Sequence, residues 1–203
     1  MNYLKKTGFF AVLLGIFVFG TFQPCHAKAI PATEIQFGGI TVLTTLEQVT
    51  AIYGEPTTKR EYVSTKDRRG NYNVSSDLNK LKGALASGDI GHFVEYVYGS
   101  GNNQLVITAV APSNRYTKGN IPSQIHNKKL KIATASITAN NLKTPAGISV
   151  GSTLDQVEKA YGKSSHISSH NNELTYFYDG RGIHFYIIFK NGKVIKMTLS
   201  GLM

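Results

Sequence analysis

Two segments of the chain have nearly the same sequence, and this repeat limits the possible fold more than any other feature. Residues 39–54 read GITVLTTLEQVTAIYG, and residues 147–162 read GISVGSTLDQVEKAYG. Aligned without a gap, nine of the sixteen positions are identical. A chain with two such copies is expected to be a tandem duplication that builds the same local structure twice.

Each copy carries the signals of one short helix. Thr45 with Gln48, and Thr153 with Gln156, have the spacing of a capping box at a helix start. Apolar residues then follow at i, i+3 and i+7, which gives one apolar stripe. These residues are Leu46, Val49 and Tyr53 in the first copy and Leu154, Val157 and Tyr161 in the second. A glycine closes each segment, as expected where a left-handed residue ends a helix.

Strand-like segments follow the helix in the second copy. They are His166–Ser169, Leu174–Asp179, Ile183–Lys190 and Val194–Ser200. The dipeptide Asn191-Gly192 is a strong hairpin signal between the last two. In simple register, alternation puts one set of side chains in the core: Ile183, Phe185, Ile187, Phe189, Ile195, Met197 and Leu199. The other face is mixed, as on a sheet open on one side: His184, Tyr186, Ile188, Lys190, Val194, Lys196 and Thr198.

The first copy has the same parts and an insertion. Its strand-like segments are Lys59–Ser64, His92–Tyr98 and Gln104–Ala111. The insertion covers about residues 65–91, opens with basic residues, and offers one short helix over Ser76–Ser87. Long insertions in compact domains often serve function.

These elements predict an α+β fold of two tandem helix-plus-antiparallel-sheet repeats. The first repeat is assigned to residues 30–112 and the second to residues 128–203. Residues 113–127, which are polar and contain Pro and Gly, are expected to link them.

The first 29 residues have the layout of a secretory signal peptide. Lys5 and Lys6 precede a run of 15 uncharged residues, Gly8–Phe22. A membrane-spanning helix is the competing interpretation, but it needs roughly 20 apolar residues. Cleavage after Ala27 or after Ala29 fits the small-residue rule, and the sequence before Cys25 departs from the lipoprotein pattern. We therefore expect export to the periplasm, cell surface or medium, with no stable membrane span after cleavage.

Composition limits the partners and the chemistry of the predicted mature chain. Cleavage after Ala29 leaves 174 residues with 19 Lys and Arg against 12 Asp and Glu, and with no cysteine. A disulfide scaffold, a cysteine-ligated zinc site and a thiol nucleophile are thereby excluded. A basic exported protein is attracted to anionic surfaces, such as acidic cell-wall polymers, lipid headgroups or acidic proteins.

The repeat unit resembles that of β-lactamase inhibitory proteins. It is also similar to the single-copy unit of the small outer-membrane assembly lipoproteins. The residues that carry the likeness are Gly147-Ile148, Leu154, Val157, Tyr161-Gly162, Tyr176-x-Tyr178 and Asn191-Gly192-Lys193-Val194. The resemblance covers about 120 of the 174 residues and implies a binding, inhibitory or assembly module. The inhibitors carry disulfides and the assembly proteins are lipidated, so neither partner is carried over to this chain.

The sequence offers little sign of catalytic or cofactor chemistry. It contains no phosphate-binding loop or HExxH motif, and its carboxylates are not paired. His166 and His170 would share one face of a strand, but about 13 Å apart at ~3.3 Å per residue, too far to chelate one metal ion. The basic residues are spread, and the strong nucleic-acid-binding modules are missing. We therefore predict no enzyme, cofactor, metal site or nucleic-acid partner.

The predicted function is that of an exported, non-enzymatic binding module, with a cell-envelope assembly or maintenance scaffold as the alternative. The expected partner is a protein or an anionic envelope polymer. One candidate site is the open sheet face of the second copy, with His184, Tyr186, Lys190 and Lys196. The other is the insertion, with Lys66, Arg68 and Arg69. Tyrosine and basic side chains are common in recognition surfaces, although the sheet face could instead be solvated or covered by the first copy.

Overall fold

The structure, a computed structural model, describes residues 30–31, 33–66, 69, 72–78, 90–111, 122–180 and 182–201. The predicted signal peptide, Arg68 and most of the helix expected over Ser76–Ser87 lie outside these residues.

The two predicted helices are present with their predicted caps. Helix α1 spans Leu46–Tyr53 and helix α3 spans Leu154–Tyr161. In each, the N-cap threonine side chain accepts a hydrogen bond from the backbone of the glutamine three residues on, and the glutamine side chain accepts one from the threonine backbone. Gly54 and Gly162 end the helices with φ of 77° and 79°, a region that favours glycine.

In the described part of the chain, nine strands form a single antiparallel sheet. They are β1 (Thr58–Lys66), β2 (Tyr72–Ser75), β3 (Ile90–Ser100), β4 (Asn103–Ala111), β5 (Ile132–Ile137), β6 (His166–His170), β7 (Glu173–Gly180), β8 (Ile183–Lys190) and β9 (Lys193–Gly201). Their order in the sheet is β2-β1-β3-β4-β5-β9-β8-β7-β6. The predicted α+β class is confirmed, and β5 and β9 join the two halves of the sheet.

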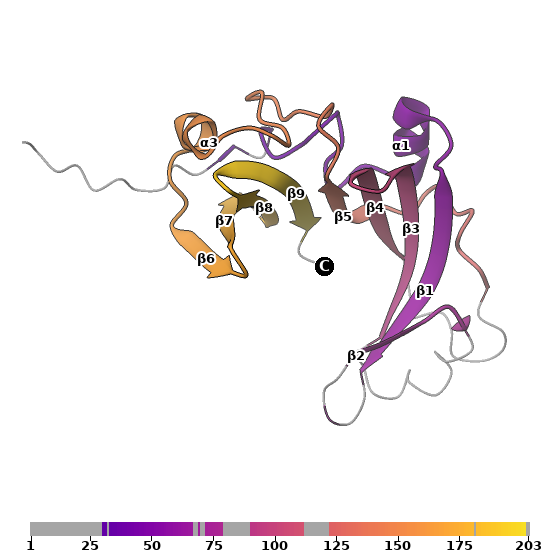
Figure 1. The fold of residues 1–203 in the computed structure, drawn as a ribbon. Coiled ribbons are helices and arrows are strands. Elements are labelled where there is room, and N and C mark those ends of the chain that lie inside the picture. Colours follow the sequence, from indigo (N-terminus) through magenta and orange to yellow (C-terminus); the bar gives the residue numbers. More distant parts are fainter. Residues whose placement is uncertain are drawn as a thin grey trace, which may run out of the picture.

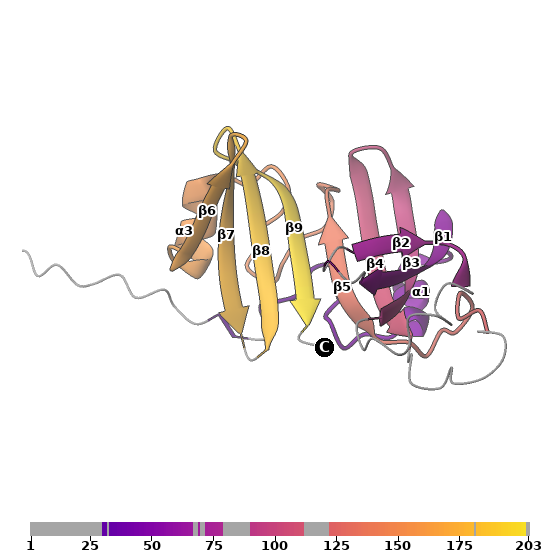
Figure 2. The same ribbon diagram turned by 90° about the horizontal axis from the view of Figure 1, so that it is seen from below.

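Both helices lie on the same face of this sheet (Figure 1). Figure 2 views the molecule from below, on the side of the sheet away from the helices, with the strands in front of the helices. We call this second side the open face. In Figure 1 both ends of the sheet, β6 on one side and β1 with β2 on the other, turn away from the helices.

The core lies between the helices and the sheet, and alternation along the strands identifies most of it. Phe185, Ile187 and Phe189 of β8 are buried, as predicted. In β9, Met197 and Leu199 are buried as predicted, but the prediction was wrong at the start of the strand, where Val194 is buried and Ile195 is only half-buried. The cause is a β-bulge, because Ile188 pairs with Lys196 while Phe189 already pairs with Val194.

The N-terminal segment before α1 packs against the far half of the sheet. Ile30 and Ile35 are buried, and a Cβ on Gly180 of β7 would lie 2.3 Å from the Ile35 side chain. The segment (indigo in Figure 1) thus crosses towards the second half before α1 begins. Its residues belong to the same hydrophobic cluster as those of both helices. In the part of the chain that the structure describes, no helix is long and apolar enough to cross a membrane.

Candidate binding surface

Strand register places a patch of aromatic rings on the open face of the second half. Residues paired between neighbouring strands lie on the same face of a sheet. Phe177 of β7 pairs with His166 of β6 and with Tyr186 of β8, and His184 is two positions before Tyr186. We call His166, Phe177, His184 and Tyr186 the four-ring patch.

Phe177 is the centre of the four-ring patch. Its ring centroid lies 5.1 Å from that of Tyr186, 5.2 Å from that of His184 and 5.8 Å from that of His166. The His166 ring meets it edge-on, at 83°. Such contacts contribute about 0.5–1.5 kcal/mol each beyond the buried area, so the rings are held by one another although they face away from the core.

A shallow groove of about 400 Å³ lies over this patch at the β6 edge of the sheet. Residues 165–168, Thr175, Phe177 and Tyr186 line it. Its floor is therefore aromatic and its rim carries hydroxyl groups. Aromatic surface with a few placed polar groups is the usual composition of a binding site.

His184 has an unusual environment within the patch. Its Nδ1 atom is buried and has no hydrogen-bond partner within the described part of the chain, and Asp179 Oδ1 lies 3.7 Å from it. Buried polar atoms normally have a closer partner than this.

The two lysines predicted for this site follow the rings along the sheet. Lys190 is exposed, with its Nζ 3.8 Å from Glu173 Oε1. Lys196 is half-buried and pairs with Ile188, so it shares the open face. The structure thus brings His184, Tyr186, Lys190 and Lys196 onto one face, as the alternation predicted.

Two members of the patch were missed by the sequence analysis. Phe177 is the unnamed middle residue of the Tyr176-x-Tyr178 motif, and both tyrosines are buried on the helix side. Alternation alone would have assigned Phe177 to the open face. His166 could not be placed there without the register that the β6–β7 hairpin fixes.

The basic insertion is described only in part. Lys66 ends β1, where it pairs with Tyr72 of β2, and Arg69 is exposed. Arg68 lies outside the described residues. The contribution of this second predicted site therefore remains a prediction.

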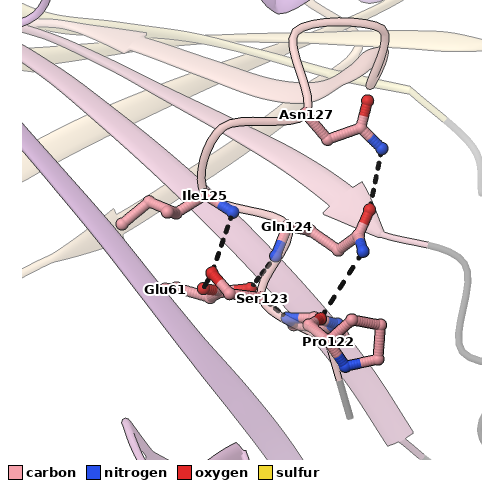
Figure 3. Close-up of polar contacts among 7 residues, drawn as sticks. Glu61, Pro122, Ser123, Gln124, Ile125 and Asn127 are labelled. Carbon is pink, nitrogen blue, oxygen red and sulfur yellow. Dashed lines mark hydrogen bonds and ion pairs between the residues drawn. The ribbon is translucent and has the colours of Figure 1, made fainter.

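A separate polar cluster attaches residues 122–127 to strand β1 (Figure 3). Glu61 of β1 accepts hydrogen bonds from Ser123 Oγ and from the backbone N–H of Gln124, both at 2.5 Å. Its Oε1 is also 2.7 Å from His92 Nε2, and the His92 side chain is fully buried. Since the serine hydroxyl donates to the carboxylate and the imidazole has no access to solvent, this cluster serves to fasten residues 122–127 to the sheet.

Metal ligands do not gather in the described part of the chain. Within it, no group of three or more His, Cys, Asp or Glu side chains could hold an ion. His166 and His170, at the two ends of β6, share the open face without a third ligand beside them.

Comparison with known proteins assigns no family to the chain. No protein-family model and no curated protein matches it. A DUF4309 family protein (YjgB) from Bacillus subtilis is 12% identical with a TM-score of 0.39, over 80% of this chain and 81% of that one. A cysteine-rich secretory protein (SAV1118) from Staphylococcus aureus is 8% identical with a TM-score of 0.48, over 85% and 48%.

The resemblance noted in the sequence has a counterpart among solved structures. A Streptococcus mutans protein described as a candidate β-lactamase inhibitor is 15% identical, over 79% of this chain and 84% of that one, with a TM-score of 0.23. At these values no partner or activity follows from the likeness.

Proposed function

We propose that the chain is an exported, non-enzymatic binding module that recognises an anionic partner through the open face of its second half. The four-ring patch and its groove form the contact surface, and Lys190 and Lys196 supply positive charge beside it. Export rests on the leader-like residues 1–29.

The proposal includes a tandem duplication, which several matching contacts support. Leu46 N–H donates to Leu130 C=O, and Ile132 N–H donates to Thr44 C=O, so β5 is tied to the start of α1. Equivalent hydrogen bonds tie β9 to the start of α3. Leu154 N–H donates to Gly192 C=O, and Val194 N–H donates to Ser152 C=O. On this correspondence β5 is the counterpart of β9, which favours a boundary between the units after Ile137 instead of within residues 113–127.

The strand pairings support the same correspondence. The β4–β5 pair is irregular between Thr108 and Ala109, and the β8–β9 pair is irregular between Ile188 and Phe189, at matching places. This correspondence makes Ser136 and Thr198 counterparts. The two residues pair with each other at the β5–β9 junction, and their hydroxyl oxygens are 2.9 Å apart.

A comparison between the two halves carries the functional proposal. Core positions are similar: Tyr96 and Tyr98 correspond to Tyr176 and Tyr178, and Ile107 corresponds to Ile187. Open-face positions differ. The first half has Val97 in place of Phe177, Val106 in place of Tyr186, Gln104 in place of His184, Thr58 in place of His166 and Thr134 in place of Lys196. Since the first half builds the same sheet without these groups, folding does not require them in the second.

Both halves of the chain are basic. Residues 138–203 hold seven Lys and Arg against four Asp and Glu, and residues 30–137 hold twelve against eight. The half with the four-ring patch therefore has a net positive charge, which attracts anionic partners and orients their approach.

The test replaces the central rings by the residues found in the first half. We expect the double variant Phe177→Val, Tyr186→Val to keep its fold but to bind labelled polyglutamate and envelope extract roughly tenfold more weakly, because truncating aromatic side chains at the centre of an interface costs on the order of 1–2 kcal/mol. Phe93→Val is the matched control, since it removes a ring from the open face of the first half.

Three results would refute the proposal. Binding could be unchanged in the double variant, or reduced equally in Phe93→Val. It could also depend only on the insertion, as shown by a loss in Arg68→Glu, Arg69→Glu alone. Recovery of the protein solely in a standing membrane complex would favour the scaffold alternative.

A further inference from the structure

Strand β6 forms one edge of the sheet and offers an uncovered backbone. It pairs with β7 on one side, and no described strand pairs with it on the other. All five of its residues, His166–His170, are exposed. Exposed edges of this kind present free backbone donors and acceptors to other chains.

The hairpin geometry shows which backbone groups point outwards. Asn171 and Asn172 have φ of 48° and 61°, and they join His170 directly to its partner Glu173 in a two-residue turn. The pair that flanks such a turn is hydrogen-bonded, and hydrogen-bonded pairs alternate along an antiparallel ladder. The N–H and C=O groups of Ile167 and Ser169 are therefore directed away from the sheet.

We propose that β6 receives an extended, acidic segment of a partner protein as an additional strand of the sheet. The inference rests on the proposed function, because the groove beside β6 belongs to the same binding surface, and it specifies the partner as a polypeptide. The ladder would be extended through Ile167 and Ser169.

Side chains around β6 define what that segment contains. Ile167 is 43% exposed on the helix side of the strand, where an apolar partner residue would cover it. On the open face the small Ser168 leaves access to the groove floored by Phe177, which suits a second apolar residue. His166, His170 and the exposed Lys163 lie at the ends of the strand, so acidic residues suit the flanking positions.

Charge also argues against a second copy of this chain as the occupant. Two copies paired through β6 would bring together two halves that each hold seven Lys and Arg against four Asp and Glu. Like charges across an interface oppose association. A polysaccharide supplies no peptide ladder for Ile167 and Ser169.

The test removes one outward N–H and leaves the rest of the strand intact. Proline is tolerated at edge positions whose N–H faces solvent, so Ser169→Pro is the test variant and Ser169→Ala is its matched control. The probe is a fluorescein-labelled peptide that alternates glutamate with valine, measured by anisotropy with the full chain. We expect Ser169→Pro to weaken binding about threefold to tenfold, as for one lost backbone hydrogen bond, and Ser169→Ala to bind as the wild type does.

Hydrogen exchange with the bound peptide provides a second measurement. We expect the Ile167 and Ser169 amides to exchange more slowly in the complex. Unchanged exchange there, equal affinity of Ser169→Pro and wild type, or equal binding of a peptide with prolines at alternate positions would overturn the inference. If Phe177→Val, Tyr186→Val loses binding while Ser169→Pro does not, only strand addition fails. If neither variant changes binding, the proposed function fails as well.

Discussion

Replacing Glu61 by alanine should be among the most destabilising single changes in the first half. The side chain is 9% exposed, and it accepts hydrogen bonds from Ser123 and Gln124 while lying 2.7 Å from the buried His92. Hydrogen bonds to a charged group contribute about 1.5–3 kcal/mol each. Water can replace the carboxylate at exposed Ser123, but not at fully buried His92. We therefore expect a loss of about 2–4 kcal/mol, from the lost hydrogen bonds and the buried imidazole nitrogen that no longer contacts the carboxylate.

The assay is urea unfolding at neutral pH, with hydrogen exchange at the Gln124 amide as a local measurement. Glu95→Ala is the control, because Glu95 lies on the neighbouring strand and its ion pair, at 3.4 Å, is with the exposed Arg60. That change should cost no more than about 1 kcal/mol. If Glu61→Ala and Glu95→Ala destabilise equally, Glu61 does not fasten residues 122–127 to the sheet.

Three further changes test the packing and the ionisation of the fold. Leu46→Ala should cost about 2–5 kcal/mol in urea unfolding because Leu46 is fully buried, whereas Leu43→Ala, at a 67% exposed position, should be nearly neutral. Burial raises the pKa of Tyr161 to about 12, so the folded state keeps its proton longer than the unfolded state and stability should fall from about pH 10 upwards; this fall should be smaller in Tyr161→Phe. Hydrogen bonds from Lys128 and Lys59 lower the pKa of Glu55 to about 2, so its contribution is complete above about pH 4.5 and is lost as the pH falls towards 2. Glu55→Gln should show less of this acid loss, and superimposable curves for variant and wild type would contradict the ion-pair assignment.

Local signals predicted the helices and most strands. Capping boxes and apolar spacing are complete within a few residues, so Thr45 and Thr153 begin helices as expected. The same holds for the alternation that put His184 and Tyr186 on the open face. These features need no information about which strand pairs with which.

The remaining features depend on pairing between distant segments. The bulge that exchanges Ile195 for Val194 in the core appears only when β8 and β9 are aligned. His166 joins the four-ring patch through the β6–β7 register. Glu61 meets Ser123 across 62 positions of sequence, and no local pattern connects them.

Hydrogen exchange of the full chain, with and without polyglutamate, tests the binding surface most directly. We expect slower exchange concentrated in β6, β7 and β8, whose open face carries Phe177 and Tyr186. Protection confined to β1–β3, to the insertion at residues 65–91 or to the helices would contradict the account, as would an exchange map that polyglutamate leaves unchanged.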